Sequence, residues 1–178
     1  LIARVVFSSL MHACKVDNQT KALVLTGTHS YDSVEFKAMW DSFENIEYDL
    51  VETGDNPEKL FEDPAQFDYD VVVMYNFRQR ISEEGKANLT EVLENGAGLV
   101  VLHHALGGFY DWIEYEEIIG ATYLLQEEER DGVLLKRPTW KHGVDIAIKV
   151  EDTEHPVTAG VADFEIHDEA YDNWIYHD

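Results

Sequence analysis

Short apolar runs alternate with amphipathic stretches along the chain from Lys21 to Gly120. Four of these runs are rich in branched or aromatic residues, which is typical of strands in a parallel sheet; they cover residues 22–27, 47–51, 69–75 and 98–102. The stretches 33–45, 82–95 and 111–119 predict helices, because they carry apolar residues at helical spacing or begin at a capping residue. The stretch 57–67 contains two prolines and predicts a short helical turn and a loop. This alternation predicts an α/β fold with helices on both faces of a parallel sheet.

The first predicted helix, 33–45, is based on the spacing of its apolar residues. Its apolar positions recur at helical spacing, with Phe36 and Trp40 beside them, and they are Val34, Ala38, Met39 and Phe43. This spacing predicts a helix over about residues 33–45.

The pattern changes after Ala121. Short extended runs follow one another without helices between them, at residues 123–125, 133–135 and 144–150. Residues 154–160 predict a turn, and residues 164–171 predict a strand that leads into an acidic loop holding His167, Asp168, Glu169 and Tyr171. This part of the chain therefore predicts a short antiparallel extension.

The charge balance narrows the choice of partners. The chain has 178 residues, with 13 Lys and Arg against 36 Asp and Glu, and a net charge of -23. Its length suits one domain with a real core. Such a field repels phosphate backbones and anionic lipid, so we expect no nucleic-acid partner. The simpler interpretation of the acidity is a well-solvated surface.

The single cysteine, Cys14, excludes a disulfide or a cysteine metal cage within one chain. The preceding residues, LIARVVFSSLMHA, are mostly apolar after a basic residue and resemble the end of a bacterial lipoprotein signal, although His12 is unusual there. One interpretation is that residues 1–20 are a signal segment and linker, that Cys14 carries a lipid anchor, and that the protein is exported to the periplasm. The alternative is an ordinary strand or helix in a cytoplasmic protein. The run is too short to span a membrane as a helix, and no later segment is a transmembrane candidate.

Polar residues follow three of the predicted strands, where ligands bind in open parallel sheets. These clusters are residues 27–32, residues 76–78 and the pair His103-His104, and the acidic loop would add its side chains. A lone histidine is most often a surface or structural residue, but two after a buried strand suggest a site. In an extended strand His103 and His104 would point to opposite faces, one structural and one functional, unless a sharp turn changed that alternation. The following Gly107-Gly108 pair would let a ligand approach the backbone.

These residue types permit two kinds of chemistry. Histidine beside a carboxylate suits acid–base catalysis near neutral pH. Two or three histidines with one carboxylate also suit Zn²⁺ or a similar divalent ion, and the set would be His29, His104 and Glu169. The chain has no His-Glu-x-x-His motif, which weakens the metal interpretation, and no phosphate-binding glycine motif, which argues against a nucleotide cofactor. It also has no Gly-x-Ser-x-Gly elbow.

Several motifs occur together in a fixed order. They are Gly27-x-His29, the segment GLVVLHHA ending at Ala105, Trp112-x-x-Tyr115, His155-Pro156-x-Thr158-x-Gly160 and Asp168-Glu169-x-Tyr171. Together they resemble the ThuA-like (trehalose utilisation) family of the class I glutamine amidotransferase-like superfamily. The resemblance covers residues 21–178 and implies a flavodoxin-like three-layer sandwich and a role in sugar metabolism, in particular with 3-keto-disaccharides. It also implies a C-terminally truncated domain, since members generally continue past the last motif.

The resemblance carries no amidotransferase chemistry with it. Amidotransferases of the superfamily hold a cysteine nucleophile at the end of the strand where this chain has His103-His104-Ala105, and Cys14 lies far from that position. Acyl transfer of that kind needs the thiolate. We therefore expect no glutaminase activity.

Two hypotheses follow. In the first, the protein is a sugar-active enzyme in which His104 is the base or a metal ligand, His29 its partner, Glu169 the acid or third ligand, and Asp168 an orienting carboxylate. The saccharide would contact the remaining candidate residues, Tyr31, Asn76, His103, Trp112, Tyr115 and Tyr171. In the second, the chain is a non-catalytic module that binds a saccharide or a protein, with structural histidines and a lipid anchor at Cys14. No oligomeric state is predicted.

Overall fold

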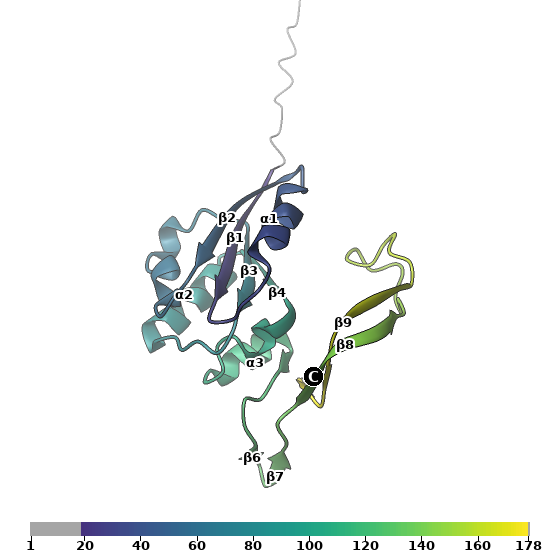
Figure 1. Ribbon diagram of the computed structural model, residues 1–178. Coiled ribbons are helices and arrows are strands. Elements are labelled where there is room, and N and C mark those ends of the chain that lie inside the picture. Colours follow the sequence, from purple (N-terminus) through teal and green to yellow (C-terminus); the bar gives the residue numbers. More distant parts are fainter. Residues whose placement is uncertain (1–18, 178) are drawn as a thin grey trace, which may run out of the picture.

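The computed structural model describes residues 19–177 of the chain (Figure 1). The expected signal segment, including Cys14, lies outside the described residues apart from Gln19 and Thr20. Within residues 19–177, no helix has the length and apolar character needed to cross a membrane.

Four parallel strands form the main sheet, in the order β2-β1-β3-β4. They are β1 (Thr20–Gly27), β2 (Ile46–Glu52), β3 (Val71–Asn76) and β4 (Gly98–Val101). The two middle strands, β1 and β3, are buried on both faces, which explains why their sequences are continuous apolar runs. All four strands predicted from the apolar runs are confirmed, and with the helices they confirm the α/β class.

Three α-helices and three 3₁₀ turns connect and cover these strands. Helix α1 (Ser33–Asp41) begins after Asp32, whose carboxylate accepts hydrogen bonds from the first-turn amides, and α2 (Glu83–Glu94) begins after Ser82 in the same way. Helix α3 (Ile113–Ile119) ends at Gly120, where φ is +74°. The 3₁₀ turns are Pro57–Phe61, Pro64–Gln66 and His103–Gly107.

Helices α1 and α2 pack against opposite faces of the sheet (Figure 1). Trp40 and Phe36 of α1 cover one face, which presents Ala22, Val24 and Val73. On the other face, Leu89 and Val92 of α2 join a core cluster with sheet residues and a 3₁₀ turn, namely Leu23, Leu25, Val72, Met74 and Phe61. The alternation of side chains in a strand sends neighbouring residues of β1 into these two separate clusters.

Helix α1 confirms the helix predicted over 33–45, but the apolar residues on which the prediction was based are exposed. Val34 is 74% exposed, Met39 and Phe43 are also exposed, and the helix packs through Phe36 and Trp40 instead. Those two rings lie four residues apart, hence on one helix face, and they bury more apolar area than a valine and a methionine can. The helix also ends at Asp41, so Phe43 lies beyond its last turn.

The later strands form three separate two-stranded antiparallel sheets and do not extend the main sheet. They pair β5 (Ala121–Thr122) with β10 (Ile175–Tyr176), β6 (Glu128–Arg130) with β7 (Val133–Leu135), and β8 (Thr139–Ile148) with β9 (Phe164–Asp172). The expected run at 123–125 is not a strand, although Tyr123 and Leu124 are buried. The long β8–β9 hairpin stands beside the α/β body (Figure 1).

The strand predicted over residues 164–171 is confirmed as β9, and the acidic loop expected from the same residues is wrong, since Asp168, Glu169 and Tyr171 belong to this strand. Its partner strand β8 pairs Trp140 directly with Tyr171. Because residues two apart in a strand share a face, Glu169 and Tyr171 point to the same side of the hairpin. The strand therefore fixes the two side chains beside each other, which a loop would not do.

Candidate functional site

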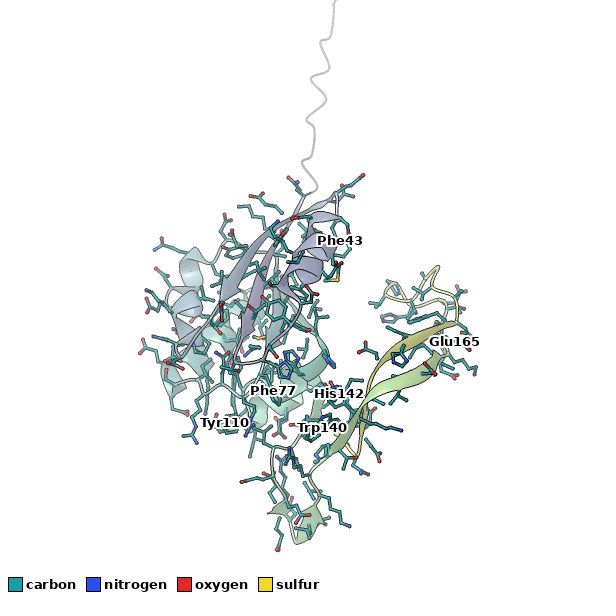
Figure 2. The ribbon with its side chains drawn as sticks, in the orientation of Figure 1. Phe43, Phe77, Tyr110, Trp140, His142 and Glu165 are labelled. Atoms are coloured by element: carbon teal, nitrogen blue, oxygen red, sulfur yellow. The ribbon has the colours of Figure 1, made fainter. Side chains whose placement is uncertain are left out.

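A cavity of about 400 Å³ lies between the carboxyl end of the sheet and the β8–β9 hairpin. Its volume is in the range of small-molecule sites. Phe77 on the sheet side, and Trp140 and His142 on the hairpin, mark its facing walls (Figure 2). The lining residues are Thr28, His29, Phe77, Arg78, His103, His104, Leu106, Tyr123, Leu125, Arg137, Trp140, His142, Glu169 and Tyr171. A second hollow, of about 530 Å³, includes Lys21 and Asp68 and none of the predicted site residues.

On the sheet side of this cavity, three strands are each followed by a residue with a positive φ angle. Thr28 follows β1, Arg78 lies two residues after β3, and His103 lies two residues after β4; their φ angles are 60°, 54° and 52°. A positive φ is energetically unfavourable for residues other than glycine, and non-glycine residues in this conformation are often found at functional sites. Each strand therefore turns sharply at the edge of the cavity instead of continuing past it.

Glu169 is the centre of a polar cluster on the hairpin side. The Tyr171 hydroxyl donates a hydrogen bond of 2.6 Å to Oε2 of Glu169, and His103 Nε2 lies 3.2 Å from the same hydroxyl and 3.4 Å from Oε2. His142 Nδ1 lies 3.3 Å from the other carboxylate oxygen. With its side chain 13% exposed, Glu169 is surrounded by donors on both oxygens.

The protons in this cluster can be assigned from the donors present. Burial, followed by the hydrogen bond to Glu169, raises the pKa of Tyr171, so the phenol keeps its proton and donates it to the carboxylate. The hydroxyl oxygen can then only accept from His103, which must carry a proton on Nε2. When the His103 ring is neutral, its lone pair is therefore on Nδ1.

His104 has a different environment from its neighbour. Its Nε2 lies 3.1 Å from the carbonyl oxygen of Tyr75 and donates to it, while its Nδ1 is buried without a partner within residues 19–177. Burial lowers the pKa of His104 to about 4, so the ring is neutral at neutral pH. The carboxylate of Glu169 lies beside His103 and not beside His104. The two histidines begin a 3₁₀ turn, so the alternation of an extended strand does not apply to them.

His29 packs on the His104 ring, with the ring centroids 4.3 Å apart. Its Nδ1 lies 2.9 Å from the carbonyl oxygen of Ser30 and donates to it, which leaves Nε2 as the lone-pair nitrogen of the neutral ring. The structure thus brings His29, His103, His104, Glu169 and Tyr171 together around one cavity.

Five other predicted residues do not line the cavity. Trp112 and Tyr115, which were expected to stack on a sugar, are core residues, 3% and 1% exposed. Asn76 is buried and donates to Gln79; Tyr31 donates to Thr26; and Asp168 accepts from the backbone amide of Glu169. Tyr115 still supports the site, because its hydroxyl bonds to the carbonyl of Ala105 in the turn that carries both histidines.

The Gly107-Gly108 pair is adjacent to protein and not to ligand space. A side chain at Gly107 would come within 2.9 Å of the Phe77 ring, and one at Gly108 would meet the carbonyl of Ala105 at 3.0 Å. The carbonyls of both glycines accept hydrogen bonds from the backbone amides of Arg78 and Gln79. The glycines therefore let the segment after β3 pack closely onto the turn after β4.

Sequence reasoning missed the hairpin wall. Trp140 and His142 lie two residues apart in β8, opposite β9, and Arg137 precedes that strand. The alternation in 139–142 was a usable signal, since residues two apart in a strand share a face. Recognising it would have required knowing that β8 pairs with the strand holding Glu169.

The metal alternative gains no ligand set from this geometry. Within residues 19–177, no group of three or more His, Cys, Asp or Glu side chains is arranged so that it could hold a metal ion. Of the predicted set His29, His104 and Glu169, His104 has one ring nitrogen bound to a carbonyl and the other enclosed by protein.

One protein family matches the sequence. The family described as ThuA, trehalose utilisation, matches residues 21–178, the same part of the chain that carries the motifs from Gly27-x-His29 to Asp168-Glu169-x-Tyr171. No curated protein and no solved structure matches the chain significantly.

Proposed function

Because the chain belongs to the ThuA family of trehalose utilisation, a glutamine amidotransferase-like family with a role in sugar utilisation, we propose that it is a saccharide-converting enzyme with His103 and Glu169 as its acid–base pair. The observation that carries this proposal is the chain of contacts from Tyr171 through Glu169 to His103 at the edge of the cavity. A carboxylate that orients one nitrogen of an imidazole leaves the other nitrogen to take up a proton.

The proposed substrate is a 3-keto-disaccharide or a related oxidised saccharide. In such a sugar the hydrogen on C2 is acidic because it is next to the carbonyl, and the glycosidic oxygen leaves from C1. His103 Nδ1 would remove the C2 proton, the C2–H electrons would form the C1–C2 double bond, and the C1–O bond would break. The imidazolium, stabilised by Glu169, would return its proton to the departing oxygen.

The other lining residues suit a sugar. Trp140 is 48% exposed, and two further aromatic residues of the lining, Tyr123 and Tyr171, lie edge to face with each other. The cavity therefore offers aromatic surface to a pyranose ring. His104, neutral and bound to the Tyr75 carbonyl, would hold the floor of the cavity in shape. Glutaminase activity is no part of this proposal, since the only cysteine in the sequence is Cys14.

Turnover of a 3-keto-disaccharide by purified protein tests the proposal. Glu169→Gln and His103→Gln should each lower kcat by about a hundredfold or more, the usual contribution of an acid–base group. Glu165→Gln, on the same strand but outside the cavity, is the matched control and should leave turnover unchanged. Parallel assays with added zinc and with a chelator test the metal alternative.

The contrary results are also specific. Unchanged turnover in both Glu169→Gln and His103→Gln would overturn the assignment of the pair. Saccharide binding by calorimetry, without conversion of any saccharide, would favour the non-catalytic binding module.

Two finer assignments belong to this proposal as well. The order β2-β1-β3-β4 agrees with the flavodoxin-like strand order and supports that fold type. We also propose, from the sequence of residues 1–20, that the protein is exported and carries a lipid on Cys14. Mass spectrometry of the membrane fraction of expressing cells tests this, and an unmodified Cys14 would contradict it.

A further inference from the structure

The arginines of the described residues fall into two groups. Arg80 lies 3.7 Å from the carboxylate of Asp111, and Arg130 forms a two-pronged pair with Glu116 at 2.6 and 3.0 Å. The other two, Arg78 and Arg137, have no carboxylate within 4.0 Å among residues 19–177, and both line the cavity. Although the chain has a net charge of -23, both guanidinium groups without a carboxylate partner among residues 19–177 are thus at the candidate site.

Both guanidinium groups rest on aromatic rings. Arg78 Cζ lies 5.9 Å from the ring centroid of Phe77, and Arg137 Cζ lies 5.4 Å from that of Trp140. A cation over the face of an aromatic ring is attracted to the ring, and the N–H groups of a guanidinium can still donate hydrogen bonds. Burial raises the pKa of the Tyr123 phenol, which also lines the cavity, and the positive charge of Arg137 opposes this rise.

The cavity has no carboxylate that pairs with these two arginines. Glu169 is the only carboxylate among its lining residues, and both of its oxygens already face Tyr171, His103 and His142. A neutral saccharide would not need two guanidinium groups, whereas a carboxylate or phosphate can accept paired hydrogen bonds from each.

Arg78 and Arg137 approach from different parts of the fold. Arg78 follows β3, where its backbone amide donates to the Gly107 carbonyl at 2.9 Å and φ is 54°. Arg137 lies between β7 and β8, on the hairpin side. A ligand held by both would contact the two walls of the cavity at once.

We propose that the natural ligand is a saccharide bearing an anionic group, a carboxylate or a phosphate, held by Arg78 and Arg137. This inference rests on the proposed function, because it names the substrate class of the same cavity.

Calorimetric titration with three sugars tests it: trehalose, trehalose 6-phosphate and a disaccharide containing glucuronic acid. At least one anionic sugar should bind tenfold or more tightly than trehalose, and its affinity should fall as salt rises because salt screens the charges. Comparison of the phosphate and the carboxylate identifies the group that is recognised. Inorganic phosphate alone shows how much of the affinity comes from the anion.

Variants connect the preference to the two arginines. Arg78→Gln and Arg137→Gln should each reduce the preference for the anionic sugar several-fold, and the lysine variants should retain part of it. Arg80→Gln, whose arginine pairs with Asp111 outside the cavity, is the control and should keep the full preference. Circular dichroism confirms that each variant is folded.

Failure of this inference is distinguishable from failure of the proposed function. Equal binding of neutral and anionic sugars, or a preference unchanged in both arginine variants, overturns the anionic ligand even if a neutral sugar is converted. Strong arginine-dependent binding of an anionic sugar supports it, even if no saccharide is converted and the proposed enzyme activity is lost. Because His103→Gln leaves both arginines in place, that variant should retain the preference.

Discussion

His103 and Glu169 lie with Nε2 3.4 Å from Oε2, across the joint between the main sheet and the β8–β9 hairpin. His103 begins the turn after β4, whereas Glu169 is in the middle of β9, so neither part of the fold contains both members of the pair. Tyr171 connects them, since its hydroxyl is within hydrogen-bond distance of each. The candidate site is therefore formed only where the two parts meet.

Replacing Tyr171 with phenylalanine should lower kcat for saccharide conversion by about tenfold or more and change KM little. The variant removes the 2.6 Å hydrogen bond that fixes Glu169 and the acceptor that orients His103, while it keeps the aromatic ring. Steady-state kinetics on the substrate of the acid–base test provide the measurement. Tyr176→Phe, at an exposed position in β10, is the matched control, and equal rates in the two variants would show that Tyr171 does not orient the pair.

His104 should make the protein less stable in mild acid. Its pKa is about 4 in the folded protein and about 6.5 when unfolded, so the unfolded chain binds the proton more tightly. The contribution of His104 to the free energy of unfolding is largest above about pH 6.5 and is lost as the pH falls toward 4. About 2 kcal/mol of it is lost between pH 7 and pH 5.

His104→Gln separates this effect from the titration of the many carboxylates. The glutamine amide can still donate to the Tyr75 carbonyl but does not titrate. Urea unfolding at pH 7 and pH 5 should therefore show a smaller loss of stability in the variant than in the wild type. Equal losses in the two proteins would mean that His104 is accessible to protons when folded.

Gly85→Ala should destabilise the protein although alanine favours helices. Gly85 lies in α2, and a Cβ there would come within 2.6 Å of Glu58 and 2.7 Å of Ile81 side-chain carbons. The helical gain is about 1 kcal/mol, and overpacking costs about 1–3 kcal/mol, so we expect a net loss of up to about 2 kcal/mol in urea unfolding. Glu84→Ala, at an exposed position of the same helix, is the control and should change stability by less than about 0.5 kcal/mol. If Gly85→Ala were more stable than the wild type, helix α2 and the 3₁₀ turn Pro57–Phe61 would have to be able to move apart.

The strands of the main sheet were predictable because both faces of β1 and β3 are buried, which leaves a continuous apolar run in the sequence. Family membership was also predictable, and the match to residues 21–178 confirms it. The buried face of α1 was not, because Val34 and Met39 satisfy the same helical spacing as Phe36 and Trp40, and only packing distinguishes the two stripes.

The grouping of polar residues at the strand ends was predictable for His29, His103 and His104. The hairpin side was predicted less well. Glu169 and Tyr171 were named and their strand was predicted, but its pairing with β8, and so the presence of Trp140 and His142 opposite them, depends on long-range contacts. The choice between His103 and His104 also depended on a backbone detail, the φ of 52° at His103, that no local pattern indicates.

The composite cavity has a consequence for motion. Within residues 19–177, the contacts that join the hairpin to the body include the β5–β10 pairing next to it, the His103–Glu169 pair, and the contacts of Tyr171 with His103 and Tyr123. A segment held by so few contacts can open locally without global unfolding. A ligand that contacts both the sheet and the hairpin can bind only when the hairpin is packed against the body, and it therefore stabilises that arrangement. The occupancy of the cavity would then set how often the hairpin opens, and amide hydrogen exchange in β9 would slow on binding while exchange in the buried strand β1 stays the same.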